Sequence, residues 1–256
     1  MNGIDQTLLE HRFELGKSRY ISERLEKSPN ITEHCCSLSG YLHVSYAVQD
    51  VPVLPLVQGV FLGAYMYVKD WFGYENDMMF DLWMAPEVID LQYMAGLPCE
   101  ESSFFAPGRR NGMHVILFVS PQSCRVNNDK DRLLGIFAHE VTHYVVQGIS
   151  HATICSMKRK QELDVPMWLE EGFCQLIDSE LYPSLQQRRA EKIARITKWY
   201  DWGDLWNDLS SCDDPATAYL QAYKETKALV ETRGKSEIIR LLYLNRTHDV
   251  NWKDLP

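Results

Sequence analysis

Several features that would place this chain in a common class are missing from its sequence. No two cysteines are spaced as CxxC, and the cysteine count of seven is odd. The chain does not open with a basic stretch followed by an apolar core, so we expect no signal peptide. Free thiols in a reduced, cytoplasmic protein are then the simplest interpretation of the cysteines.

Long uninterrupted hydrophobic runs and an excess of basic charge are missing as well. The most apolar stretch, residues 51–68, is broken by two prolines, a glutamine and two glycines, whereas a membrane span needs roughly 20 mostly apolar residues. We therefore predict a buried core segment there and no membrane partner. The net charge is −9, which argues against a nucleic-acid partner because such proteins need a basic surface.

The chain also lacks internal repeats and low-complexity tracts, and its 256 residues suffice for one large domain or two small lobes. Apolar patterns predict strands at residues 40–48, 78–85 and 112–120. In the last of these, the strongest strand signal, residues 114, 116 and 118 face one side and residues 115, 117 and 119 the other. Helical patterns occupy residues 5–27, 56–72 and 86–96.

The second half of the chain is predicted to be almost entirely helical. Asn128 or Asp129 can cap a helix that runs to about Gln147 and stops at Gly148. After a loop at 150–164, with Asp164 as a possible cap, helices are predicted from Pro166 onward, over residues 184–200 and 213–234, and from 235 to about 244. The charge run in 184–200 is expected to serve as a solvated outer face. The pattern indicates an α+β fold with an N-terminal α/β lobe, residues 1–150, and a helical C-terminal lobe, residues 151–256.

The stretch "GIFAHEVTHYVVQG", residues 135–148, contains the motif HExxH. On a helix, His139 and His143 lie on one face, one turn apart, so both imidazoles can bind one metal ion. Glu140 is rotated by about 100° and can reach a water on that metal without occupying a ligand position. This arrangement is typical of hydrolysis rather than metal storage.

The alternative is an ordinary helix carrying two surface histidines. The rest of the helix weighs against it, because apolar residues surround the motif on nearly every face and predict a buried helix. These residues are Leu133, Leu134, Ile136, Phe137, Val141, Val145 and Val146. Two histidines and a glutamate in such a helix would be costly without a partner, and a metal supplies one.

A catalytic zinc usually takes a third protein ligand and keeps one position for water. His151 does not fit the metzincin pattern HExxHxxGxxH, because Gly148 and His151 come two residues too late. The other candidates are the two glutamates in "PMWLEEGFCQLI", residues 166–177. Together with HEVTH, this segment resembles the gluzincin metallopeptidases, above all the peptidase MA-like group with its WLxEG motif.

The resemblance covers roughly residues 77–245 and implies a zincin-like fold, with a mixed sheet on one side of a cleft and a helical lobe on the other. It implies Glu171, immediately before the glycine, as the third zinc ligand and Glu170 as the variable position. Residues 112–120 take the place of the family's edge strand, to which an extended peptide substrate pairs.

The implied function is zinc-dependent peptide hydrolysis, in which Glu140 is the general base acting on a zinc-activated water. Tyr219, and after it Tyr223, are candidates for stabilising the oxyanion; the alternative for each is a core tyrosine with a satisfied hydroxyl. Gln175 and Asp178 are candidate acceptors for the second N–H of a ligating histidine. The expected partner is a peptide or protein substrate.

Two rival hypotheses remain open. The chain could be a metal-binding protein without proteolytic activity, either a remnant or a structural zinc site, which a fourth protein ligand would favour. His151 or a cysteine could supply that ligand, and Cys174, three residues after Glu171, lies on nearly the same helix face. The second rival, a protease of DNA-bound proteins, is disfavoured by the acidic charge.

Overall fold

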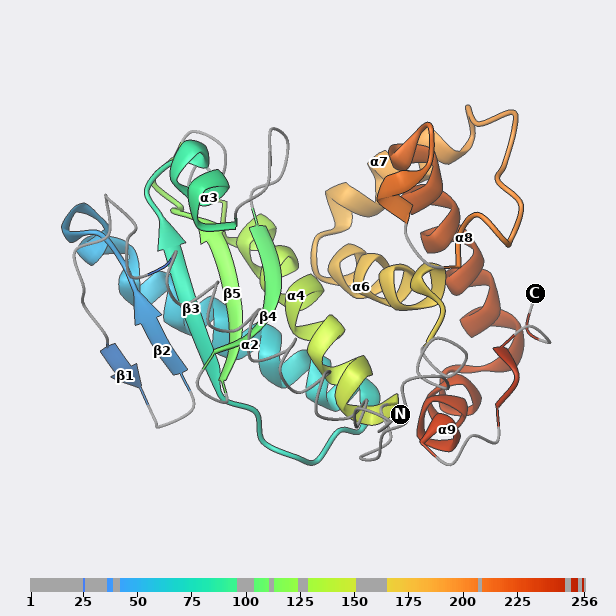
Figure 1. Ribbon diagram of the computed structural model, residues 1–256, viewed down its shortest axis with the longest axis horizontal. Coiled ribbons are helices and arrows are strands. Elements are labelled where there is room, and N and C mark those ends of the chain that lie inside the picture. Colours follow the sequence, from blue (N-terminus) through green and yellow to red (C-terminus); the bar gives the residue numbers. More distant parts are fainter. Residues whose placement is uncertain are drawn as a thin grey trace, which may run out of the picture. The chain divides into compact units, whose positions relative to one another are not determined.

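The computed structural model describes most of the chain (Figure 1). The described residues are 25, 36–38, 42–95, 104–110, 113–123, 129–150, 165–206, 209–246, 250–252 and 255. The chain divides into two compact units, which we call the sheet unit and the helical unit. The sheet unit comprises residues 1–63 and 75–136, and the helical unit comprises residues 64–74 and 137–256. One point of division falls inside a helix, between residues 136 and 137.

The sheet unit is built around one mixed sheet of five strands in the order β1-β2-β3-β5-β4. The strands are β1 (Cys36–Leu38), β2 (Leu42–Ser45), β3 (Phe80–Ala85), β4 (Phe104–Arg110) and β5 (Met113–Val119). The three inner strands run parallel, and β1 and β4 pair antiparallel at the two edges. The mixed α/β architecture expected from the sequence is therefore present.

The predicted place of residues 112–120 at the edge of the sheet is wrong. Strand β5 lies between β3 and β4, and β4 is the edge strand on that side. The reason is visible in β5 itself, where every residue from His114 to Val119 is buried. A strand that is buried on both faces belongs in the interior of a sheet.

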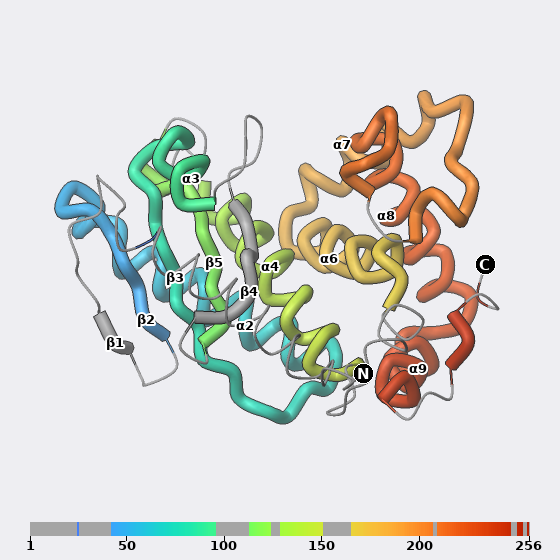
Figure 2. Tube along the Cα trace, in the orientation of Figure 1, coloured from blue at the N-terminus to red at the C-terminus, as the bar shows by residue number. Residues whose placement is uncertain are grey.

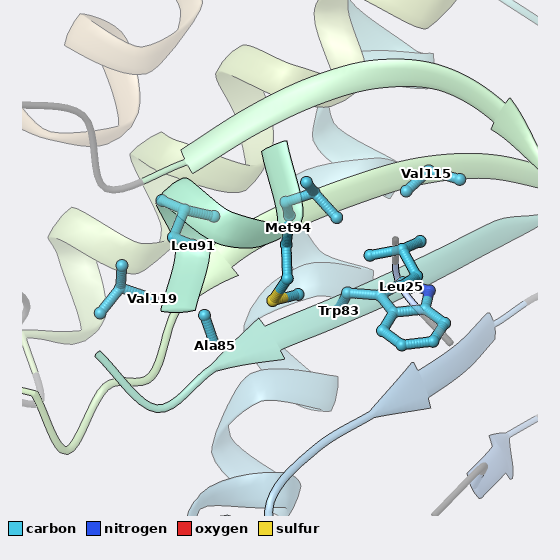
Figure 3. Packing of buried hydrophobic residues seen from close by; sticks show 8 residues of the cluster. Leu25, Trp83, Ala85, Leu91, Met94, Val115 and Val119 are labelled. Carbon is cyan, nitrogen blue, oxygen red and sulfur yellow. The ribbon is translucent and has the colours of Figure 1, made fainter. Parts of the chain in front are cut away.

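The two faces of β5 pack as the alternation predicts. Figure 3 shows one face, where Val115 and Val119 gather with Trp83 of β3 and with Leu91 and Met94 of helix α3 (Val88–Ala95). On the other side Phe80 of β3 packs edge-to-face against Phe61, with ring centroids 5.0 Å apart. Full burial of such side chains contributes about 1.5–3 kcal/mol each, so this core is the main source of the sheet unit's stability.

Helices α2 (Leu54–Phe72) and α4 (Lys130–Ser150) both contribute residues to the two units. The helix predicted at 56–72 is confirmed as α2. A short 3-10 helix, η1 (Val48–Val53), precedes it, and by length and composition alone the stretch Val48–Phe72 could cross a membrane. The buried core helix of a soluble protein meets the same test.

Helix α4 begins as predicted, because the Asp129 carboxylate accepts a hydrogen bond from the Arg132 backbone N–H, 3.0 Å away. The predicted stop at Gly148 is wrong, since α4 continues to Ser150. A glycine inside a helix costs only about 1 kcal/mol. Val145, Val146 and Ile149 around it are completely buried, and their packing outweighs that cost.

Besides its parts of α2 and α4, the helical unit has among its described residues α6 (Met167–Leu181), α7 (Pro183–Ile193), α8 (Pro215–Arg233) and α9 (Lys235–Asn245), with a 3-10 turn, η2 (Leu209–Ser211), before α8. Figure 2 follows them in order along the chain. The predicted helices at 213–234 and 235–244 are confirmed, but α7 is shorter than the predicted 184–200. The predicted cap at Asp164 and almost all of the predicted helix at 5–27 lie outside the described residues.

Two contacts hold α6 in the helical unit. The end of α2 packs on it, with the Trp71 and Phe72 rings edge-to-face on Phe173 at 5.9 and 5.5 Å. On α8, the side chain of Thr226 and the backbone of Ala222 approach so closely that a Cβ on Gly172 would lie 2.0 Å from Thr226 Oγ1. The glycine of WLEEG is therefore the point at which α6 and α8 meet.

Candidate metal centre

His139 and His143 project from one face of α4, one helical turn apart. Their ring centroids are 5.2 Å apart, and their side chains are 12% and 15% exposed. The residues around them, including Phe137, Val141 and Val145, are completely buried. The prediction that the motif lies in a buried helix is confirmed, so the two imidazoles need partners inside the protein.

Glu171 of α6 faces both imidazoles. Its Oε2 atom lies 3.6 Å from His139 Nε2 and its Oε1 atom lies 3.6 Å from His143 Nε2. Glu171 Oε2 is buried, and no residue in the described part of the chain donates a hydrogen bond to it. Two ring nitrogens and one carboxylate thus converge from two helices.

The opposite edges of both rings are held by carboxylates. His139 Nδ1 lies 3.2 Å from Asp178 Oδ2, and His143 Nδ1 lies 2.9 Å from Glu170 Oε1. An ionised carboxylate can only accept, so each Nδ1 carries a proton and each Nε2 is left with its lone pair when the ring is neutral. This orientation is the one that metal-ligating histidines require.

Sequence reasoning found only one of these two carboxylates. Of the two predicted acceptors, Asp178 does contact a histidine Nδ1. Gln175 does not, because its side-chain amide donates to the Tyr219 backbone carbonyl at 2.8 Å. Glu170, interpreted as the variable position of the motif, holds His143 and also accepts from Gln147 at 3.0 Å. The signal that was available is the pair of adjacent acidic residues, because neighbours on a helix point about 100° apart and can reach different edges of one ring.

Arg189 of α7 connects the centre to the next helix. Its guanidinium donates to both carboxylate oxygens of Asp178, to the Ser179 hydroxyl and, at 2.7 Å, to the Gln175 carbonyl. The basic run of 184–200 was expected to be a solvated outer face, and most of α7 is indeed exposed. Arg189 is the exception, since it neutralises the carboxylate that orients His139.

Several carboxylates lie around the two histidines and raise their pKa values. Burial lowers the pKa of His139, but its hydrogen bond to Asp178 and the nearby charge of Glu171 outweigh burial and raise that pKa to about 10. Burial also lowers the pKa of His143, but the charge of Glu171 and the hydrogen bond with Glu170 outweigh it and raise that pKa to about 9. The negative charge of these carboxylates favours a cation at the centre, and a divalent metal ion could take the place of the two imidazole protons.

The two remaining acids at the centre shift in opposite directions. Burial raises the pKa of Glu171, yet the two histidines outweigh it and lower that pKa, which keeps the carboxylate charged. For Glu140, which is 3% exposed, burial dominates and raises the pKa of the carboxyl group. The donor set of two neutral imidazoles and one carboxylate fits a zinc ion, and Glu140 is a buried acid beside it.

Cys174 is a further donor at the same place. One ligand atom from each of His139, His143 and Cys174 lies within 4.8 Å of the other two, and the thiol is completely buried. Burial and four nearby carboxylates raise its pKa well above the usual value. Glu171 and Cys174 are thus both candidates for the third ligand, since the two Glu171 oxygens each lie 3.6 Å from a different imidazole nitrogen. His151, the other candidate for an additional ligand, lies outside the described residues.

Tyr219 and Tyr223 lie one turn apart on α8. The Tyr219 backbone carbonyl accepts the bond from Gln175, and the Tyr223 ring lies under the Arg189 guanidinium, 5.3 Å from its carbon. Tyr223 is buried, whereas Tyr219 is partly exposed. These contacts tie both residues to the elements that carry Glu171 and Arg189. A role for either hydroxyl in the chemistry stays a prediction.

Comparison of the chain with protein-family models and with curated proteins gives no match.

Proposed function

We propose that this protein is a zinc-dependent metallopeptidase of the gluzincin type, with His139, His143 and Glu171 as metal ligands and Glu140 as general base. The proposal includes a zincin-like fold and a peptide or protein substrate. Its main support is the arrangement of Glu171, whose two oxygens each lie 3.6 Å from one imidazole Nε2.

That distance matches what a shared zinc ion requires. Zinc–nitrogen and zinc–oxygen bonds of about 2.0–2.2 Å at tetrahedral angles separate neighbouring ligand atoms by roughly 3.4 Å. A direct hydrogen bond between the same groups would be about 2.9 Å. The observed separations are too long for hydrogen bonds, and they agree with ligands that have a metal ion between them.

The protein's own residues supply the rest of the chemistry. When bound, zinc polarises a carbonyl oxygen and makes water more acidic. Glu140 is buried and its pKa is raised by that burial, so its carboxylate is a stronger base than an exposed glutamate. It can take a proton from water and deliver it to the leaving amine. Asp178 and Glu170 keep the two Nε2 lone pairs directed at one point.

The alternative function, a structural zinc site in a protein without peptidase activity, has one observation in its favour. Cys174 is close enough to both histidines to be a fourth ligand, and structural sites have all four positions filled by protein. Glu140 has no use in such a site, and burial of an acid without a role is costly. We therefore favour the peptidase.

The test is metal analysis and peptide cleavage with the full-length protein and its Glu140→Gln variant. Wild type is expected to bind one zinc ion and to cleave members of a broad peptide mixture, as detected by mass spectrometry. Glu140→Gln should keep the zinc and lose about 10²–10⁴-fold in cleavage rate, the usual contribution of a general base. Glu237→Gln, the same change on a partly exposed residue of α9, is the matched control and should leave both properties intact.

Equal cleavage by wild type and Glu140→Gln would exclude Glu140 as the base. Stoichiometric zinc without cleavage of any peptide by wild type would favour the structural site.

A further inference from the structure

The Cys174 sulfur is the donor at the centre that the hydrolytic mechanism does not use. It follows Glu171 by three residues on α6, so the two side chains share one helix face. Ligand pairs at this spacing occur in metal sites built on helices, where a carboxylate and a second donor one turn on bind the same ion. The Cys174 sulfur also lies within 4.8 Å of a ring nitrogen of each histidine, which is close enough for all three residues to bind one ion.

The Cys174 sulfur differs from the two imidazoles in that no hydrogen bond fixes its position among the described residues. Both imidazoles are fixed by hydrogen bonds from their Nδ1 atoms to Asp178 and Glu170. For Cys174 no hydrogen bond occurs within the described part of the chain, and the cysteine is a free thiol. Binding or release of a metal by this sulfur would therefore break no other hydrogen bond among the described residues.

We propose that Cys174 is a displaceable fourth ligand of the zinc centre. In the absence of substrate its sulfur bonds to the metal and fills the position that hydrolysis needs. Forming the metal–sulfur bond releases the thiol proton to solvent, and the reverse exchange takes a proton up again. The inference rests on the metal site of the proposed function and adds to it a resting state that the protein itself closes.

A sulfur ligand has two consequences. Thiolate prefers zinc and other soft ions to magnesium or manganese, so Cys174 would bias the centre toward zinc. It would also slow hydrolysis, because substrate must displace the sulfur before a carbonyl oxygen can approach the metal. Replacing Cys174 should therefore weaken metal binding and raise the cleavage rate.

Cobalt substitution tests the proposal directly, because a sulfur–cobalt bond produces a near-ultraviolet charge-transfer absorption that nitrogen and oxygen ligands do not. Full-length metal-free protein would be titrated with Co²⁺ in four forms: wild type, Cys174→Ala, Cys174→Ser and Cys212→Ala. Cys212 is a partly exposed cysteine outside the centre whose sulfur donates to the Asp204 backbone carbonyl at 3.9 Å, so its replacement is the matched control.

We expect the charge-transfer band in wild type and Cys212→Ala and its loss in both Cys174 variants, with the visible cobalt bands retained in all four. Zinc affinity, measured by competition with a chelator, should fall at least about tenfold in Cys174→Ala, the lower end of what losing support at a metal site costs. The near-isosteric serine variant keeps the test valid if the alanine variant folds poorly.

The outcomes separate this inference from the proposed function. A near-ultraviolet spectrum that is the same in wild type and both Cys174 variants would overturn the inference, even if Glu140-dependent cleavage occurs. A band that depends on Cys174 in a protein that cleaves no peptide would support the ligand and refute the peptidase.

Discussion

Replacing Gly172 by alanine should separate α6 from α8 and thereby disturb the metal centre. A Cβ at this position would lie 2.0 Å from Thr226 Oγ1, 2.6 Å from the Ala222 carbonyl oxygen and 2.7 Å from Thr226 Cβ. Ordinary van der Waals contact begins at 3.4 Å. The threonine hydroxyl can rotate away, but the Ala222 oxygen belongs to the backbone of α8. The helices must therefore move apart by several tenths of an ångström.

Two opposing effects set the size of the change. Overpacking of a core typically costs 1–3 kcal/mol, and a clash that moves a helix backbone belongs near the upper end. Alanine also gains about 1 kcal/mol over glycine in helix propensity. The expected net loss in the free energy of unfolding is about 2 kcal/mol. Because Glu171 precedes the substituted residue, zinc affinity should fall together with stability.

Urea unfolding of the metal-free protein measures the loss of stability, and chelator competition measures the loss of zinc affinity. Gly59→Ala is the matched control, because Gly59 lies in α2 and a Cβ there meets nothing within 4 Å; it should be neutral or stabilising. Adding Thr226→Ala to Gly172→Ala should restore only part of the loss, since the contact with the Ala222 oxygen remains. A Gly172→Ala protein as stable as wild type would refute the close approach of α6 and α8.

Three further predictions concern the groups around the histidines. Asp178→Asn and Glu170→Gln should each weaken zinc binding by about 10–100-fold, as measured by chelator competition; unchanged affinity would show that neither carboxylate orients its ring. Arg189→Met leaves Asp178 buried without its counter-ion and should destabilise the protein by about 3 kcal/mol in urea unfolding. Adding Asp178→Asn should recover part of that loss, and additive losses would contradict the pairing. In the metal-free protein the pKa values of His139 and His143 are raised to about 10 and about 9, so their stabilising contribution is complete below pH 6.5 and is lost as the pH rises through those values. The urea midpoint of chelator-treated protein should accordingly fall between pH 7 and pH 10, and a flat profile would contradict the assigned contacts.

Local structure could be predicted from the sequence where residues close together in the chain determine it. The apolar run of β5, the Asp129 cap of α4 and the glycine that ends α8 each act within a few residues. The position of β5 in the sheet could not be predicted in the same way, because strand order depends on pairing between distant segments. The edge strand β4 escaped notice since Pro107 interrupts it, and the strand accommodates that proline at a register shift between Phe105 and Gly108.

The candidate site shows the same limit. Spacing on a helix is enough to place His139 and His143 on one face, and the resemblance to a family motif suggested Glu171. The helix-to-helix contacts that surround these residues follow from how α6, α7 and α8 pack. Arg189 illustrates this, because nothing in a run of exposed basic residues distinguishes the one that reaches a buried carboxylate. Glu170 was missed for a related reason, since its contact with His143 Nδ1 depends on how α6 packs against α4.

The three consecutive residues Glu170, Glu171 and Gly172 do different jobs because a helix turns by about 100° at each step. Glu170 reaches His143 Nδ1 and Glu171 faces Nε2 of the same ring, so adjacent acids hold opposite edges of one imidazole. Gly172, one step further round, faces α8 and allows it to approach α6. Moving any of the three by one position would turn an acid toward α8 or a glycine toward the two imidazoles. The order of the residues in this motif is therefore a consequence of helix geometry.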